Sequence, residues 1–305
     1  MIAAGIDLGG TKIEAQVFAP DWTLQARHRW PTPKDYPALV QAMADVVRWV
    51  ETHGKAPIGI SAAGLINPKT GLALTSNLSA TGKPFPADIA QAAGRKIAWI
   101  NDCRALTLSE ATLGAAKGAD PAVGLILGTG VAGGVVTGGK LLPSPAQTGG
   151  EFGHFPLAAP PIAAHNLPIL TCGCGREGCV ETYLSAPGLA RIAAHLTGVT
   201  HTPETIVEGR ATTPAFAMAW DIWLDLATEF LITLCLTIDP EVIVLGGGLS
   251  RAHGLTEDLS RRLTKATLTG FPIPAIRLAE GGDASGARGA ALHALNEAKA
   301  EAVHA

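Results

Sequence analysis

Three glycine-rich turns in this chain follow short apolar segments, and the first two of them could bind phosphate. The first lies in Gly5 to Lys12, where the strand candidate Ile2 to Leu8 carries Asp7 near its end and leads into Gly9 and Gly10. Amide groups with no side chain in the way can receive phosphate oxygens, and a carboxylate beside them is suited to holding Mg²⁺, usually through water. The alternative is a plain hairpin turn in which glycine supplies a positive φ.

The sequence around this first turn excludes two familiar nucleotide-binding loops. A second strand candidate, Ile13 to Phe18, follows the turn where those loops would need a helix. The glycine spacing also fits neither a dinucleotide fingerprint nor a Walker A loop. The other two turns are Gly128-Thr129-Gly130, after Val123 to Leu127, and Gly246-Gly247-Gly248, after Val242 to Leu245. Thr129 adds a hydroxyl, although such a tripeptide alone is more often a plain tight turn.

Asn101 and Asp102 stand where the strand candidate Lys96 to Ile100 gives way to a helical segment. Open α/β sheets place their active residues at this position. Asp102 could accept the proton of an attacking hydroxyl, as phosphoryl transfer to an alcohol requires. The alternative is that Asp102 only caps the helix, because Asp is a preferred N-cap residue.

A cysteine cluster predicts a metal site. Three of the five cysteines fall within eight residues, at Cys172, Cys174 and Cys179. Three thiolates need one further ligand to close a tetrahedral Zn²⁺ site, and His154 or the nearer His165 could supply it. A disulfide is the alternative, but three thiols cannot pair evenly and we expect a reducing compartment.

Further polar groups lie in glycine-rich surroundings, at Glu151, His154 and Glu181. Carboxylates and imidazoles pair well with sugar hydroxyls, because each can accept their hydrogen bonds. Each residue taken alone is more often a solvated loop residue.

Composition narrows the class of protein. The 305 residues are 47% apolar and 16% charged, so the chain can bury a substantial core. With a net charge of −3 and no basic run beyond Arg261–Arg262, we expect no nucleic-acid partner and no anionic membrane surface. The first residues do not resemble a secretion signal, and the apolar stretch Ala122 to Val136 is too short and too glycine-rich to span a membrane. We therefore expect a cytoplasmic protein.

The order of elements predicts an α/β protein in two lobes. Strand candidates alternate with helical segments, the helices being expected at 39–50, 104–116, 186–196 and 214–236. A fresh strand-and-glycine hairpin begins after residue 118. We therefore place one lobe at 1–117, joined by a C-terminal helix at about 287–305, and the other at 118–286.

Taken together, these segments resemble the ROK family of bacterial sugar kinases, members of the actin-like ATPase superfamily. The resemblance covers nearly the whole chain and rests on six ordered motifs: GIDLGGTK (5–12), ND (101–102), LGTGVAGG (127–134), GEFGH (150–154), CGCGREGCVE (172–181) and VLGGGLS (244–250). It implies a ribonuclease-H-like fold in both lobes, an active-site cleft between them and a zinc-binding loop.

The resemblance also implies roles for individual residues. Mg-ATP would be held through Asp7, Gly9, Gly10, Thr11, Lys12, Gly128, Thr129 and Gly130, with Gly246, Gly247 and Gly248 bordering the adenosine. Asp102 would be the general base, and the sugar would contact Asn77, Asn101, Asp102, Glu151, His154 and Glu181. Structural zinc would be bound by His154, Cys172, Cys174 and Cys179, because a family histidine in this position contacts both metal and sugar.

Within the family, the likeness is to members that phosphorylate N-acetyl-D-glucosamine. The loop Ser76 to Ile89, which contains Asn77, and the long gap between His154 and Cys172 carry it. It implies ATP-dependent phosphorylation of the 6-hydroxyl of this sugar, in a protein that is often a homodimer. A glucokinase or fructokinase of the same family, or a non-catalytic sugar sensor, is the alternative. Family repressors carry an N-terminal helix-turn-helix that we do not find ahead of Gly9.

Two positions depart from the family pattern. Cys103-Arg104 stands where Ala-Asn is expected after the ND pair, and Ala63-Gly64 stands where Pro-Gly is expected. The first could place a charge beside the base, and the second could loosen a turn, since Pro fixes φ.

Overall fold

The computed structural model describes residues 1–282 and 285–304, which form two compact units. Unit 1 comprises Met1–Gly114, Lys140–Gly149 and Gly281–Ala305, and unit 2 comprises Ala115–Gly139 and Gly150–Glu280. The sequence places the lobe boundaries at 117/118 and near 287. In the structure the chain changes unit slightly earlier in both places, and it also returns to unit 1 for the short segment Lys140–Gly149.

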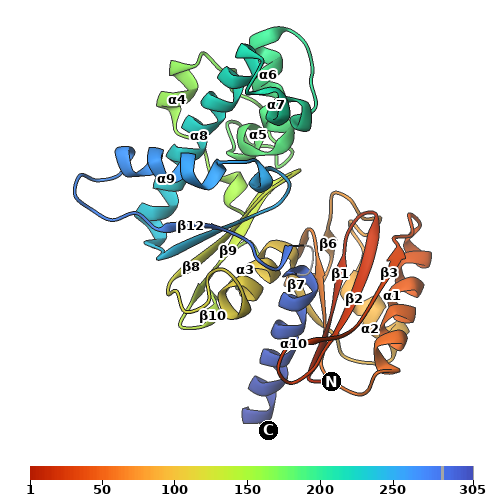
Figure 1. The fold of residues 1–305 in the computed structure, drawn as a ribbon. Helices are drawn as coiled ribbons and strands as arrows, with labels where there is room; N and C mark the ends of the chain where they lie inside the picture. Colours follow the sequence, from red (N-terminus) through yellow and green to blue (C-terminus); the bar gives the residue numbers. More distant parts are fainter. Residues whose placement is uncertain (283–284, 305) are drawn as a thin grey trace. The chain divides into compact units, whose positions relative to one another are not determined.

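Unit 1 is built on a five-stranded mixed sheet (Figure 1). Its order is β3 (Leu24–Pro31), β2 (Lys12–Phe18), β1 (Ala3–Leu8), β4 (Ile58–Ala62) and β7 (Ala98–Asn101). The first three strands are antiparallel, whereas β1, β4 and β7 are parallel. The carboxyl ends of the parallel strands therefore share one edge, where Asp7, Ser61 and Asn101 lie.

The helices of unit 1 are α1 (Tyr36–Glu51), α2 (Phe85–Ala93), α3 (Asp102–Leu113) and α10 (Ser285–His304). Alternation along β1 divides its side chains between the two faces of the sheet. One face packs into a buried core with Leu39 and Val47 of α1, through Ala4, Ile6 and Leu8. Short strands β5 (Leu65–Ile66), β6 (Ala73–Leu74) and β10 (Lys140–Leu141) complete the strands of this unit.

Helix α10 lies directly on the opposite face of the sheet. A Cβ atom at Gly5 would lie 1.7 Å from the carbonyl oxygen of Ala287, and one at Gly59 would lie 2.1 Å from that of Ala290. Both positions need glycine because helix backbone and strand backbone are in contact. Gly5 and Asp7 share a face of β1, so the carboxylate of Asp7 is on the α10 side.

Unit 2 repeats this plan with another mixed sheet. Its strands that belong to unit 2 follow the order β9 (Val131–Thr137), β8 (Ala122–Leu127), β11 (Val242–Gly246) and β12 (Ala275–Leu278), with β8 and β9 antiparallel and the rest parallel. Its helices are α4 (Ala159–Ala164), α5 (Glu181–Leu184), α6 (Ala186–Thr197), α7 (Pro203–Gly209), α8 (Pro214–Ile238) and α9 (Leu255–Ala266), with 3-10 turns η1 (Phe152–His154) and η2 (Leu249–Arg251). The apolar helix α8 supplies much of the core.

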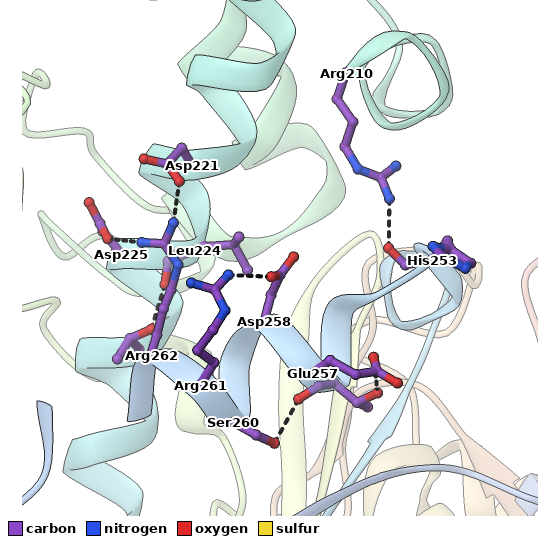
Figure 2. A network of polar contacts seen from close by, with 12 residues as sticks. Arg210, Asp221, Leu224, Asp225, His253, Glu257, Asp258, Ser260, Arg261 and Arg262 are labelled. Atoms are coloured by element: carbon purple, nitrogen blue, oxygen red, sulfur yellow. Dashed lines mark hydrogen bonds and ion pairs between the residues drawn. The ribbon is translucent and has the colours of Figure 1, made fainter. Parts of the chain in front are cut away.

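A polar network fixes α9 against α8 (Figure 2). Arg262 of α9 forms ion pairs with Asp221 and Asp225, which lie one turn apart on α8. The second carboxylate oxygen of Asp225 lies 3.0 Å from Nε2 of His165, just after α4. Arg262 thus joins two helices, and His165 attaches the loop after α4 to the same site.

Among the described residues, no helix combines the length and the apolar character that crossing a bilayer requires.

Candidate active site and metal centre

Asp7 lies near the end of β1, partly buried between a strand and a helix. Its Oδ1 atom accepts a hydrogen bond of 3.2 Å from the Ser61 hydroxyl on β4. A Cβ atom at Gly286, in the first turn of α10, would lie 2.4 Å from the same oxygen. Burial and the negative charge of Asp102 raise the pKa of Asp7 from 3.8 to about 7. The two predicted carboxylates of unit 1 are therefore close enough to sense each other's charge.

Hydrogen bonds to the carbonyl groups of Gly9, Gly10 and Lys12 fix the conformation of the first glycine turn. The Gly9 amide donates to the carbonyl of Lys12 at 2.9 Å. The Thr32 hydroxyl donates to the carbonyl of Gly9 at 2.7 Å, and the Lys34 ammonium donates to that of Gly10 at 2.6 Å. Sequence reasoning missed Thr32 and Lys34, because nothing local links them to a turn more than 20 positions earlier.

The glycines of this turn make close contacts and do not have a positive φ. Neither Gly9 nor Gly10 is among the residues with positive φ, so the plain hairpin explanation does not account for them. A Cβ atom at Gly10 would lie 3.0 Å from the backbone oxygen of Asn77 and 3.1 Å from its Cβ. The structure therefore brings the predicted sugar-loop residue Asn77 onto the predicted phosphate turn.

Asn101, and not Asp102, is the N-cap of α3. Its Oδ1 atom accepts hydrogen bonds from the amides of Cys103 at 2.9 Å and Arg104 at 3.2 Å, while its Nδ2 donates to the carbonyl of Gly64 at 3.2 Å. The amide side chain thus retains one hydrogen for a ligand. The capping role that sequence offers as an alternative for Asp102 is therefore performed by its neighbour.

Asp102 is the first residue of α3, and its carboxylate is available for chemistry. Its Oδ1 atom accepts the Cys103 amide at 2.9 Å. Burial raises the pKa of Asp102, although this hydrogen bond opposes the rise. A carboxylate whose pKa moves toward the operating pH becomes a better general base.

The departure at Arg104 anchors a neighbouring segment. The guanidinium donates to the carbonyls of Leu142 at 3.0 Å and Gly149 at 3.1 Å, both in the stretch of chain that returns to unit 1. Burial lowers the pKa of Arg104. The second departure, at Ala63, comes directly before Gly64, which has φ +106° and at which a Cβ atom would lie 2.4 Å from the carbonyl oxygen of Leu74.

In unit 2, Glu181 packs against the second glycine turn. Its Oε2 atom accepts the Val131 amide at 3.0 Å, and a Cβ atom at Gly130 would lie 2.6 Å from that oxygen. The amide of Ala186, at the start of α6, donates to the carbonyl of Gly128 at 2.7 Å. The turn is thus held between β8, β9 and the helices that follow the cysteine cluster.

The third glycine turn lies beside the second. Gly247 has φ +88°, and a Cβ atom there would lie 2.4 Å from the carbonyl oxygen of Leu127, so only glycine fits. A Cβ atom at Gly128 would lie 4.0 Å from the Gly248 amide nitrogen. Gly248 borders a cavity of about 590 Å³ whose other walls come from α7, η2 and the start of α6. A smaller cavity of about 310 Å³, lined by Thr129, Glu181 and Cys172 among others, lies on the side of the cysteine cluster.

The cysteine cluster assembles as a four-ligand set. The ligand atoms of His154, Cys172, Cys174 and Cys179 all lie within 4.8 Å of one another. The closest approaches are 3.7 Å between Cys172 Sγ and His154 Nδ1 and 3.7 Å between Cys174 Sγ and Cys179 Sγ. Tetrahedral zinc with Zn–S bonds of about 2.3 Å separates its sulfur ligands by about 3.8 Å. The side chains therefore fit zinc, and His165 is bonded to Asp225 instead.

The orientation of His154 in the cluster places its other ring nitrogen, Nε2, near Glu151. With Nδ1 toward the cysteines, Nε2 lies 3.8 Å from Oε2 of Glu151. The Arg176 guanidinium donates to the carbonyl of His154 at 3.0 Å, which ties the cysteine loop to η1. The predicted sugar residues Glu151 and His154 are thus neighbours, beside the candidate metal site.

The raised pKa of Asp7 predicts a pH dependence of stability. Between pH 3.8 and about 7 the folded chain binds a proton that the unfolded chain releases. The stabilisation from this proton is complete below the lower value and is lost as pH rises through the upper one. Asp7→Asn keeps a neutral side chain at every pH, so we expect its Tm, measured without Mg²⁺, to exceed that of the wild type most at about pH 8, less at about pH 5, and to converge with it only as the pH falls toward 3.8. Parallel curves for the two proteins would contradict the raised pKa.

Fold and site together define the class of protein. Two α/β units each carry a mixed sheet with a glycine turn between an antiparallel pair, as in the actin-like ATPases. The ROK family model matches residues 3–297. The chain belongs to the ROK family.

Two relatives and one solved structure are also similar to this chain over most of its length. The chain is 36% identical over 293 residues to the N-acetylgalactosamine kinase AgaK of Shewanella sp. (strain ANA-3), covering 94% of this chain and 95% of the relative. It is 35% identical over 300 residues to an N-acetyl-D-glucosamine kinase of Yersinia pseudotuberculosis, covering 96% and 99%. The crystal structure of a ROK hexokinase from Thermus thermophilus matches with a TM-score of 0.86 and 32% identity, over 98% of this chain and 100% of that one.

Proposed function

We propose that this chain is an ATP-dependent sugar kinase that phosphorylates the 6-hydroxyl of an N-acetylhexosamine, with N-acetyl-D-glucosamine as the first candidate. The observation that carries the proposal is the state of Asp102: a partly buried carboxylate at the start of α3, released from capping by Asn101 and electrostatically coupled to Asp7. Relatives named as N-acetylgalactosamine and N-acetylglucosamine kinases support the acetamido sugar.

The nucleotide would be bound through the glycine turns. The turns at Gly9–Thr11 and Gly128–Gly130 would receive phosphate oxygens through amides other than those of Gly9 and Gly128, which donate to the carbonyls of Lys12 and Gly130. Asp7 would hold Mg²⁺ through water. The cavity of about 590 Å³ beside Gly248 is large enough for adenosine, and its position next to the second turn supports this use.

The sugar would be bound by polar side chains. These are Asn77, Asn101 through its remaining amide hydrogen, Glu151, His154 and Glu181. Zinc on Nδ1 of His154 would fix the tautomer with hydrogen on Nε2. His154 would then donate to a sugar oxygen, while the two glutamates accept from sugar hydroxyls.

The transfer itself would need little covalent chemistry from the protein. The O6–H proton passes to Asp102 as the O6–P bond forms and the bond from the γ-phosphorus to the ADP oxygen breaks. Most of the rate would come from orienting the two reactants and from excluding water that would otherwise hydrolyse ATP.

A coupled assay of ADP release tests the substrate. We expect N-acetyl-D-glucosamine or N-acetyl-D-galactosamine to exceed glucose, mannose and fructose in kcat/KM by about tenfold or more, which corresponds to about 1.4 kcal/mol of transition-state preference. If glucose or fructose gave the highest kcat/KM, the sugar kinase activity would stand and the N-acetylhexosamine would be rejected as the substrate. No turnover with any sugar would favour a sugar sensor.

A further inference from the structure

A buried carboxylate in unit 1 lies outside the proposed chemistry. Glu110, on α3, is completely shielded from solvent. Its Oε1 atom accepts hydrogen bonds from the Gly281 amide at 2.9 Å, the Ser285 hydroxyl at 2.8 Å and the Arg288 guanidinium at 3.1 Å. All three donors belong to the start of α10 or to the chain that leads into it.

Arg288 strengthens this attachment to α3. Its Nε donates to the hydroxyl of Ser109 at 2.6 Å, so the arginine binds two consecutive residues of α3. A buried charge is costly unless it is paired and its hydrogen bonds are complete. The ion pair and its hydrogen bonds therefore favour one position for the first turn of α10.

The first turn of α10 is also the wall beside Asp7. Gly286 lies between two residues of the network, Ser285 and Arg288, and a Cβ atom on it would lie 2.4 Å from Oδ1 of Asp7. The positive end of the α10 dipole is at this turn. A displacement of α10 would thus change both the space and the electrostatic potential around the Asp7 carboxylate.

From this geometry we infer that Glu110 is a positioning residue for the proposed reaction: through Ser285 and Arg288 it fixes the first turn of α10 against Asp7, and so sets where Asp7 holds the Mg²⁺ of Mg-ATP. The inference rests on the proposed function. Glu110 acts through α10 and touches no reactant.

Two variants test the inference by different routes. Glu110→Gln removes the charge that pairs with Arg288, and Ser285→Ala removes one hydroxyl at the start of α10. For each we expect the Mg²⁺ concentration for half-maximal activity to rise about tenfold, with kcat falling by about 10–100-fold as expected for a small misplacement of a reacting group. The KM for the sugar should stay unchanged.

Val47→Ala is the matched control. Val47 is a fully buried residue of α1 that packs in the core with β1 and does not belong to the Glu110 network. It should lower Tm without changing the Mg²⁺ requirement. If the two test variants lower Tm as Val47→Ala does and keep the wild-type Mg²⁺ requirement, the network is structural only and the inference is wrong.

Calorimetric titration of Mg-ADP provides a readout that does not depend on turnover. We expect weaker binding by Glu110→Gln and Ser285→Ala than by the wild type and Val47→Ala, and equal binding by all four would overturn the inference. A wild-type protein that binds Mg-ADP but phosphorylates no sugar would instead reject the proposed function.

Discussion

Asp102→Asn should lower kcat by about 10²–10⁴-fold, the usual contribution of a general base, while sugar binding stays nearly unchanged. The amide has almost the shape of the carboxylate but cannot take the O6–H proton. Because Asn101 caps α3, the exchange should not unfold this helix. Turnover measured at saturating Mg-ATP and sugar, together with sugar affinity from calorimetry, checks both parts of the expectation.

Asp35→Asn is the matched control for this experiment. Asp35 caps α1 and accepts the Ala38 amide at 3.1 Å, a role that Asn performs equally well. The same chemical change at this helix start should therefore leave kcat and Tm close to wild type. If Asp102→Asn retained near-full turnover, Asp102 would have no part in proton transfer and the base would have to be sought elsewhere.

Loss of the metal centre should have the second large effect. The wild-type chain should contain one zinc ion, held by the four-residue cluster. Cys179 is completely buried, so solvent cannot take its place as a zinc ligand. In Cys179→Ser, a weakly binding hydroxyl replaces the thiolate. We expect zinc affinity to fall by at least about 10–100-fold, the range seen even for changes behind a metal ligand, together with lower Tm and weaker sugar binding.

Cys235→Ser separates the metal from a general effect of thiol removal. Cys235 lies on α8, outside the cluster, so this variant should keep its zinc, as measured by elemental analysis. Full zinc content in Cys179→Ser would show that the cluster is not the metal site. Zinc loss with unchanged sugar affinity would show that the metal does not orient His154.

Local sequence predicts those elements whose apolar pattern is strong. The helix expected at 39–50 is α1 (Tyr36–Glu51), and the one expected at 214–236 is α8 (Pro214–Ile238). Strand β3 (Leu24–Pro31) escaped sequence analysis because it is an edge strand whose side chains are largely exposed, so no alternation marks it. Its position depends on pairing with β2, which is not a local property.

Helix α9 (Leu255–Ala266) was missed for a different reason. Its three buried leucines, Leu255, Leu259 and Leu263, recur every four residues and form a narrow apolar stripe on a highly polar helix. That spacing is a helix signal, and it could have been recognised. The ion pairs that hold α9 on α8 through Arg262 come from residues about 40 positions away and could not.

In the site too, some features can be predicted from the local sequence, whereas others depend on residues far away in the chain. The types and spacing of the cysteines predict a metal site but leave His154 and His165 open. The family resemblance favours His154, and the fold places it in the cluster. The pair Asn101-Asp102 is recognisable locally, whereas which of the two caps α3 depends on side-chain geometry. Glu110 gives no local signal, because its partners lie more than 170 positions further along the chain.

The central claim is that phosphate passes from ATP to the 6-hydroxyl of an N-acetylhexosamine. Phosphorus NMR of a reaction of the purified protein with Mg-ATP and N-acetyl-D-glucosamine, repeated with N-acetyl-D-galactosamine, tests it most directly. We predict ADP and a sugar 6-phosphate in equal amounts with at least one of the two sugars, and no ATP consumption without sugar. Inorganic phosphate in place of the sugar phosphate, or intact ATP with both sugars, would contradict the claim.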